Sequence, residues 1–378
     1  MDRRILLQGG LATASLVMAG RARAAVPPAQ LIPIRVDPPE VFRTTVCTRP
    51  FREAGPRIEV ETVGRKIVVR NYGHGGSGWS LSWGSAGEAV SLAMQSSPRN
   101  VAVIGAGALG LTAAITAQRA GANVTIYTRE RFPFVRSARA TGSWTPDSRI
   151  AKAAAVTPGF GDLWERMARR ALAMHESYIS VAGNPVEWLD NYAVHDPPPP
   201  PGTPQPPDED TGFLYLQDRI RDLEPRYSDV PNDRHPFNSE HVRMGAQLTF
   251  NVAAYSHQLE QDFLIAGGRF AHADFRSPAD FAHLKEHVVI CCTGYDSRAL
   301  WKDDTIIPVR GQIVWLTPQE GVHYGVSKGS LLVLARRDGI VVQETGPNET
   351  YGMGDDSEAV DEDAKQAALD KLKTIYRT

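Results

Sequence analysis

A glycine-spaced turn between two short apolar runs constrains this chain more than any other feature. The segment NVAVIGAGALGLTAAITAQRAGANVTIYTRE occupies residues 100–130. Val101–Ile104 is apolar and largely β-branched, as expected of a buried parallel strand. Thr112–Arg119 is rich in Ala and predicts a helix, and Val124–Tyr127 predicts a second strand. This order of elements predicts an α/β fold.

The glycines of this turn have the spacing G-x-G-x-x-G. Gly105 permits the tight turn, Gly107 lets the backbone approach a pyrophosphate, and Gly110 lets the helix pack closely on the strand. The helix N-terminus offers free N–H groups and its positive dipole end to phosphates. Glu130 follows Gly110 by 20 residues, where an acid accepts hydrogen bonds from a ribose. The alternative is a glycine-rich turn in an ordinary βαβ unit, which the terminal acid disfavours.

Composition bounds the class of protein. A chain of 378 residues predicts two domains, because one hydrophobic core seldom serves so many residues. A net charge of -2 argues against a nucleic-acid or anionic-membrane partner. Three cysteines form no disulfide framework, and the histidines lack metal-ligand spacing, so we expect no metal site.

The first 24 residues predict an export signal rather than a folded element. Arg3 and Arg4 precede an apolar run from Ile5 to Ala19, and Ala22-Arg23-Ala24 offers a small-residue cleavage site. The run is shorter than the roughly 20 apolar residues of a transmembrane span, so we expect no stable membrane insertion. These features predict a periplasmic or secreted protein exported by the twin-arginine route. The alternative is an uncleaved tail.

Further elements are expected along the rest of the chain. Asp196–Asp210 holds eight prolines and predicts an extended loop. Amphipathic or apolar patterns predict helices at residues 158–182, 252–267 and 359–376, and strands at residues 66–70, 287–293, 307–316, 331–335 and 339–342.

Several passages together resemble the D-amino acid oxidase family of FAD-dependent oxidoreductases. NYGHGGSGWSLSWGSA (residues 71–86) resembles the glycine-rich flavin segment of that family, and RPFREAGPRIEVE (residues 49–61) resembles the stretch before it. VAVIGAGALGL is similar to the family's first βαβ unit, ATGSWTPDS (residues 140–148) to the turn after it, and CCTGYDSRAL (residues 291–300) to a strand that ends at the flavin. VRGQI (residues 309–313) is similar to the strand that opens the substrate domain.

The resemblance implies a Rossmann-like FAD-binding domain and a second, α+β substrate domain built on a mostly antiparallel sheet. The order of the segments differs, because those that close the family's chain come first here. This resembles a circular permutation, which is tolerated where termini lie close together. The implied parts are a signal peptide (1–24), a linker (25–42), a substrate-domain segment (43–65), the FAD-binding domain (66–160), a substrate-domain helix with the proline-rich loop (161–240), the FAD-binding domain continued (241–300) and the substrate domain (301–378).

The resemblance also implies roles for individual residues. Arg49 would clamp a substrate carboxylate with its planar guanidinium, in a catalytic site shared with Gly76. His74 would be a structural hydrogen-bonding residue near the flavin. FAD would be held by Gly105, Gly107, Gly110, Glu130, Thr141, Gly142, Ser143, Cys292, Thr293, Gly294, Gly75, Gly76, Ser77, Gly78, Trp79 and Ser80.

The implied activity is oxidation of the Cα–N bond of an amino acid, with hydride passing to flavin N5. The imino acid would hydrolyse to a 2-oxo acid and ammonia, and dioxygen or a quinone would accept the electrons. The partner is a small amino acid or amine, and a homodimer is left open. One departure is that Lys328 and Leu332 stand where the family places tyrosines. The alternatives are an oxidase of glycine or N-methyl amino acids, a quinone-linked dehydrogenase, a flavin-binding protein without turnover, or a nicotinamide-dependent dehydrogenase.

Overall fold

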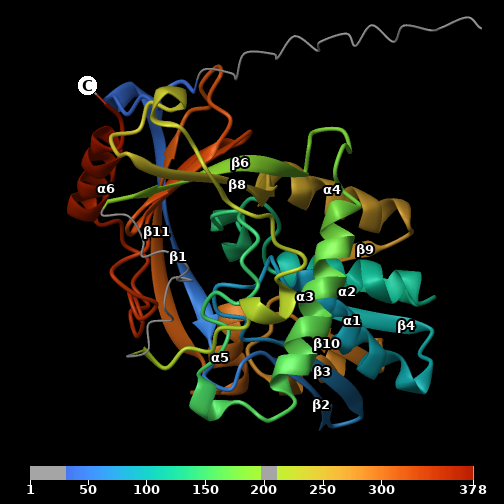
Figure 1. Ribbon diagram of the computed structural model, residues 1–378. Helices are drawn as coiled ribbons and strands as arrows, with labels where there is room; N and C mark the ends of the chain where they lie inside the picture. The colour runs from blue at the N-terminus through green and yellow to red at the C-terminus, as the bar shows by residue number, and fades with distance from the viewer. Residues whose placement is uncertain (1–30, 197–210, 378) are drawn as a thin grey trace, which may run out of the picture. The chain divides into compact units, whose positions relative to one another are not determined.

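The computed structural model describes residues 31–196 and 211–377. The predicted export signal, the first residues of the predicted linker and nearly all of the proline-rich loop lie outside these residues. The described chain is built on two β-sheets (Figure 1). The mixed α/β fold with two sheets confirms the predicted fold class.

The first sheet has six strands in the order β2-β3-β10-β4-β5-β9. All neighbouring strands are parallel except β2 and β3, which are antiparallel. The strands are β2 (Arg57–Val63), β3 (Lys66–Tyr72), β4 (Asn100–Ile104), β5 (Asn123–Thr128), β9 (Arg269–His272) and β10 (Val288–Cys291).

Both faces of this sheet are covered, as its apolar strands predict. Val288 and Ile290 of β10 join a core with four helices, whereas Val289 and Cys291 face η8 and α5 on the other side. The helices on the first face are α1 (Ser82–Ala93), α2 (Ala108–Arg119), α3 (Phe160–Glu176) and α4 (Val252–Ile265). The short helices on the second face are η8 (Pro278–His283) and α5 (Ser297–Trp301).

The second sheet has eight strands in the order β1-β11-β14-β13-β12-β6-β8-β7. Its neighbours are antiparallel except β12 and β6, which are parallel. The strands are β1 (Val41–Phe51), β6 (Val186–His195), β7 (Ser228–Asp229), β8 (His241–Phe250), β11 (Ile307–Leu316), β12 (Gly325–Lys328), β13 (Leu331–Arg336) and β14 (Gly339–Glu344).

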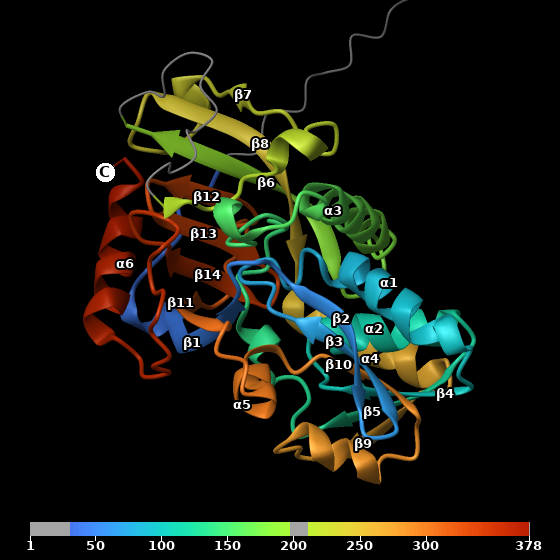
Figure 2. The same ribbon diagram turned by 90° about the horizontal axis from the view of Figure 1, so that it is seen from below.

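Helix α6 (Glu362–Thr374) covers one face of the second sheet (Figure 2). Its Leu369 and Leu372 pack in one core with Val333 and Val342. Leu334, whose side chain alternates with that of Val333 along β13, joins a different core on the opposite face. Leu334 therefore lies on the face of the second sheet that is turned away from α6.

Segments before residue 86 are shared between the two sheets. β1 pairs with β11 of the second sheet, with Arg49 opposite Val309, whereas β3 pairs with β10 of the first sheet. The predicted boundaries differ here, because β2 belongs to the first sheet although residues 43–65 were expected in the substrate domain. Likewise β8 belongs to the second sheet although residues 241–300 were expected in the FAD-binding domain.

The two ends of the described chain meet at one tyrosine pair. The Tyr376 and Tyr324 hydroxyls lie 2.8 Å apart, and the Tyr324 hydroxyl donates to the carbonyl of Ile32 at 2.8 Å. Tyr376 also forms a β-bridge with Phe237. The last described residues therefore lie close to the first.

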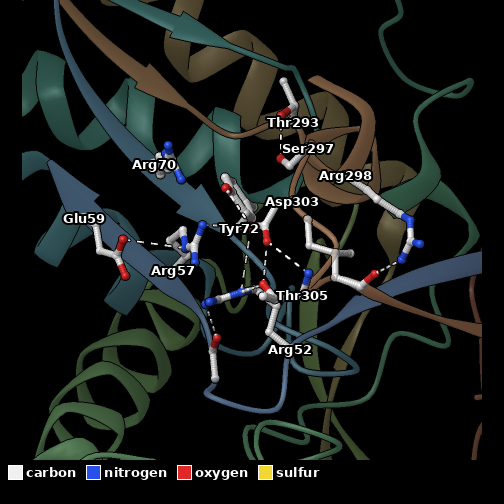
Figure 3. Close-up of polar contacts among 12 residues, drawn as sticks. Arg52, Arg57, Glu59, Arg70, Tyr72, Thr293, Ser297, Arg298, Asp303 and Thr305 are labelled. Carbon is white, nitrogen blue, oxygen red and sulfur yellow. Dashed lines mark hydrogen bonds and ion pairs between the residues drawn. The ribbon is translucent and has the colours of Figure 1, made fainter. Parts of the chain in front are cut away.

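A buried cluster around Asp303 connects residues 52–72 to the segment between α5 and β11 (Figure 3). The Asp303 carboxylate accepts hydrogen bonds from Arg57 at 3.0 Å and from the Tyr72 hydroxyl at 3.1 Å. Thr305 donates to it from its hydroxyl at 2.5 Å and from its main-chain N–H at 3.2 Å. Arg52 lies 4.0 Å from the carboxylate and donates to the Thr305 hydroxyl at 2.9 Å.

Candidate active site

A large cavity lies at the carboxyl ends of the parallel strands, where open α/β sheets bind their ligands. Its volume is about 1550 Å³. The first sheet contributes residues at or just beyond the ends of β4, β5 and β10, namely Ile104, Thr128 and Cys292. The second sheet contributes Arg49 of β1, Leu332 of β13 and Gln343 of β14. Both sheets therefore form walls of one cavity.

The glycines of the 105–110 turn serve different purposes. Gly105 has a φ of +99°, and a Cβ there would lie 2.5 Å from the Cys292 carbonyl oxygen. A Cβ at Gly110 would collide with the carbonyl oxygen of Gly105. Gly107 is less crowded, because a Cβ there would meet only Ser137, at 3.1 Å from its hydroxyl oxygen. Gly105 and Gly110 thus permit close packing, whereas Gly107 keeps the cavity wall free of a side chain.

The N-terminus of α2 opens onto the cavity. Gly107 is the N-cap residue and offers no side chain to the first turn of the helix. The Ala108 N–H donates to the Ser137 hydroxyl at 3.2 Å, and Ala106, Gly107, Ala108 and Leu109 all line the cavity. A helix N-terminus stabilises negative charge, as a pyrophosphate carries.

The glycine-rich segment forms the cavity wall beside the 145–149 turn. The Gly75 N–H donates to the Pro50 carbonyl at 2.8 Å, and the Gly76 N–H donates to the Ser148 carbonyl at 3.1 Å. The Ser77 hydroxyl donates to the same Ser148 carbonyl at 2.9 Å. Gly75, Gly76, Gly78, Trp79 and Ser80 line the cavity. Ser77 is fully buried and is not among the lining residues, so its hydroxyl holds the turn instead.

His74 is fixed by a buried chain of hydrogen bonds. The Ser85 hydroxyl donates to the Asn71 side-chain carbonyl at 2.6 Å and lies 2.8 Å from His74 Nε2. Because the serine proton is used on Asn71, Nε2 must carry the ring proton and donate to Ser85. Burial lowers the pKa of His74 to about 3. The imidazole is therefore neutral near pH 7, in agreement with a structural role.

Arg49 extends from β1 into the cavity without an anionic partner. Its guanidinium lies over Gly311 of the neighbouring strand, where any Cβ would collide with Nη2. It is half-buried and makes no hydrogen bond or ion pair to residues 31–196 or 211–377. Burial, and then the charge of Arg149, lowers the pKa of Arg49. A half-buried cation without a partner favours an anionic ligand.

The other predicted cofactor residues meet in the same cavity. The Thr141 hydroxyl donates to the Gln343 side chain at 2.5 Å, which joins the 140–143 turn to the second sheet. The Cys292 N–H donates to the Ile104 carbonyl at 2.8 Å, and burial raises the pKa of the Cys292 thiol. The lining residues include Glu130, Thr141, Gly142, Ser143, Cys292, Thr293 and Gly294.

The charged residues of the cavity that were not predicted from the sequence include Asp147, Arg149 and Glu349. Asp147 is buried and accepts a hydrogen bond from the Leu216 N–H at 3.4 Å, and burial raises its pKa to about 6. Arg149 has a φ of 48° and donates from Nε to the Glu349 carbonyl at 2.7 Å. The sequence signal was weak, because only the position of Asp147 and Arg149 directly after the 140–146 turn hints at a place in the cavity.

The two positions expected to hold tyrosines differ in their placement. Leu332 lines the cavity, whereas Lys328 is not among the lining residues. The Lys328 ammonium donates to the Asn238 carbonyl at 3.4 Å instead. Only the leucine therefore changes the chemistry of the cavity wall.

The cavity fits FAD by its donor set as well as its size. The α2 N-terminus suits the pyrophosphate, and Glu130 lies just beyond the end of β5 as an acceptor for a ribose.

Within residues 31–196 and 211–377, no three His, Cys, Asp or Glu side chains come together as metal ligands. In the same residues, no helix has the length and apolar character needed to cross a membrane.

Comparisons with known proteins identify the family of this chain. A family model described as FAD dependent oxidoreductase (DAO) matches residues 100–378. The chain is 26% identical to a D-amino-acid oxidase of Streptomyces coelicolor over 232 residues, which span 59% of this chain and 60% of that enzyme. It is 46% identical to a D-aspartate oxidase of Cryptococcus neoformans over 54 residues, or 14% of each chain.

A solved structure of glycine oxidase from Geobacillus kaustophilus is also similar, with a TM-score of 0.49 and 14% identity over 74% of this chain and 78% of that chain. The matches to these two curated relatives thus span at most 60% of the relatives' own length. The family model, by contrast, covers most of this chain. The chain belongs to the DAO family of FAD-dependent oxidoreductases, and its cofactor is FAD.

Proposed function

We propose that this enzyme oxidises the Cα–N bond of an amino acid whose carboxylate binds Arg49. The observation that carries the proposal is the guanidinium of Arg49, which has no protein partner in the described chain and shares one cavity with the dinucleotide turn. An amino acid carboxylate matches that planar fork in charge and geometry.

The other cavity residues position the substrate without acting as bases. The Gly76 N–H is donated to Ser148, so its carbonyl is the main-chain group left for the substrate amine. His74 is neutral near pH 7 and donates to Ser85, so it takes no proton from the substrate in this proposal. The amine therefore enters neutral. Bound FAD supplies the hydride acceptor, and water hydrolyses the imino acid to a 2-oxo acid and ammonia.

Two variants of one contact test the role of Arg49. Arg49→Leu should raise KM and lower kcat/KM, because it removes the partner of a desolvated carboxylate. The loss of transition-state stabilisation calculated from kcat/KM should be roughly 2–4 kcal/mol. Gly311→Ala keeps the charge but should raise KM as well, because its Cβ collides with the guanidinium. FAD content should be unchanged in both.

The matched control is Arg166→Leu, which removes an exposed arginine on α3. It should leave KM and kcat unchanged. Wild-type kinetics in Arg49→Leu would show that Arg49 has only a structural role. The remaining candidates within the enzyme class are an oxidase of glycine or N-methyl amino acids and a quinone-linked dehydrogenase, and a flavoprotein without turnover is the candidate from outside it.

The segment order is proposed to be a circular permutation of the family's order. In support, the family match begins at Asn100, and Tyr376 lies in hydrogen-bond contact with the Tyr324 hydroxyl that binds Ile32. A chain re-linked from Thr378 to Leu31 by a few residues and opened at Ser97 should therefore fold and bind FAD. Failure of that chain to bind FAD would count against the permutation.

Export by the twin-arginine route is proposed for the leader that contains Arg3 and Arg4. This route carries folded proteins, which suits an enzyme that loads FAD before it leaves the cytoplasm. The protein would then act in the periplasm or outside the cell, with dioxygen or a quinone as the electron acceptor.

A further inference from the structure

A second guanidinium faces the same cavity as Arg49. The Arg149 side chain is 10% exposed and lines the cavity. Its Nε donates to the Glu349 carbonyl at 2.7 Å and lies 3.5 Å from the Glu349 carboxylate. Its two terminal nitrogen atoms make no hydrogen bond to residues 31–196 or 211–377, yet neither is sealed from the cavity. One edge of the Arg149 guanidinium is therefore bound by Glu349, and the other edge faces the cavity.

The main chain holds Arg149 in place at some cost. Its φ of 48° is a left-handed conformation that non-glycine residues seldom adopt. Gly75 permits this arrangement, because any Cβ there would collide with the Arg149 carbonyl. The Gly75 N–H also donates to Pro50, the neighbour of Arg49. One glycine thus connects the backbones that carry the two arginines. The charge of Arg149 lowers the pKa of Arg49, so the two guanidinium groups lie within electrostatic reach of each other in the cavity.

Two acidic residues, Glu349 and Asp147, lie near this end. The Glu349 main chain and carboxylate face Arg149 Nε. Asp147 is buried, and its carboxylate accepts from the main-chain N–H of Leu216. Glu349 Oε2 is buried and accepts no hydrogen bond, and it faces the cation of Arg149. The free hydrogen-bond donors of this end are the guanidinium groups of the two arginines.

We infer that the substrate of this site is an amino acid with a carboxylate on its side chain, such as aspartate or glutamate, and that Arg149 binds that second carboxylate. The inference rests on the proposed function, in which Arg49 takes the α-carboxylate. Two free guanidinium forks match two carboxylates, and each pair is a charge-assisted, bidentate interaction. Arg149 is then the residue that determines side-chain specificity.

The test compares acids with their amides on the FAD-loaded enzyme. Aspartate and asparagine, and glutamate and glutamine, are supplied anaerobically as each enantiomer, and lysine is included as a basic substrate. Flavin reduction at 450 nm gives kcat/KM for each. The acid should exceed its amide by at least about 30-fold in one enantiomeric series, which is the lower range for a desolvated charge pair. An amide or lysine that reacts as well as the acid would overturn the inference.

Arg149→Gln should bring the acid-to-amide ratio close to one, and its FAD content should match that of the wild type. Arg149→Lys should restore part of the ratio, because it restores the charge without the planar fork. Arg166→Gln, on an exposed surface of α3, should leave the ratio as it is in the wild type. A ratio that survives Arg149→Gln would also overturn the inference.

A binding measurement separates this inference from the proposed function. If no amino acid reduces the flavin, the proposed function fails, and calorimetry on wild-type holoenzyme then tests the dicarboxylate site alone. Succinate should bind at least about tenfold more tightly than its monoamide, and Arg149→Gln should remove the difference. Equal binding of the two ligands would overturn the inference whether or not the enzyme turns over.

Discussion

Replacement of Asp303 by Asn should weaken the fold more than any single surface change. The side chains of Asp303, Arg52 and Arg57 are 4%, 7% and 19% exposed, so their charges are largely withdrawn from water. The Asn side chain keeps the shape but removes the carboxylate that the two buried guanidinium groups share, so that Arg57 retains only the exposed Glu59 carboxylate at 3.6 Å. Loss of one partner from a buried ion pair costs about 3–5 kcal/mol, so we expect that decrease in the free energy of unfolding.

The neighbouring Asp304 provides the matched control. Its side chain is 92% exposed and lies 3.8 Å from Arg298, so Asp304→Asn should change the free energy of unfolding by less than about 0.5 kcal/mol. Urea denaturation of the FAD-free proteins followed by circular dichroism measures both. A loss of similar size in the two variants, or none in Asp303→Asn, would refute the account of this cluster.

The pH dependence of the Asp303 effect has a definite sign. Burial alone would raise the pKa of Asp303, but the Thr305 hydrogen bond, the charge of Arg57 and the Tyr72 hydrogen bond outweigh it and lower the pKa below its usual value. A lowered pKa means that the ionised carboxylate stabilises the fold above the ordinary pKa of about 4. The advantage of the wild type over Asp303→Asn should therefore persist at neutral pH and disappear as the pH falls below that value.

Three further predictions concern the cofactor, the pH dependence and the leader. Gly107→Val should leave the FAD-free protein folded, because its Cβ meets only Ser137, at 3.1 Å from the hydroxyl oxygen, but it should abolish FAD binding; a yellow variant with full FAD content would contradict this. The pKa of Asp147 is raised to about 6. The protonated carboxyl therefore makes its full contribution to the free energy of unfolding below about pH 4, and this contribution is lost as the pH rises through 6. Asp147→Asn should accordingly be more stable than the wild type by about 2–3 kcal/mol at pH 8 and equal to it at pH 4 in urea denaturation, and an equal gain at both would be inconsistent. Arg3→Lys with Arg4→Lys should retain FAD-loaded protein in the cytoplasm, and normal recovery from the periplasm would count against the export signal.

Local chemistry made the dinucleotide turn predictable from the sequence. Gly105 and Gly110 are required by contacts within the turn and with the adjacent strand, so their spacing alone indicates the geometry. The start of α2 was misplaced by four residues, since the helix begins at Ala108 rather than Thr112. Glycine at positions 107 and 110 obscured the first turn, because glycine weakens the helix signal.

Long-range contacts could not be predicted in the same way. Arg49 and Arg52 share one short motif, yet Arg49 faces the cavity and Arg52 joins the buried cluster of Asp303. The alternation of side chains along a strand and its end at Phe51 separate them, and neither was predicted. Arg149 meets Glu349 across 200 residues of sequence, so only the folded chain reveals that contact.

Strands β6 and β8 were also missed. Val186–His195 does not alternate regularly between buried and exposed residues, because this strand passes from the core of the first sheet to that of the second. Period-two patterning is the main sequence signal of a half-buried strand, and it is lost where both faces are partly covered.

The most direct test of the central claim is an anaerobic titration of the purified protein with amino acids, followed in the visible spectrum. The account predicts flavin bands near about 370 and 450 nm that bleach when an amino acid is added and persist in Arg49→Leu at the same concentration. A protein without those bands would contradict the FAD site. A flavin that no amino acid bleaches, or that bleaches equally in Arg49→Leu, would contradict the oxidation of an amino acid held by Arg49.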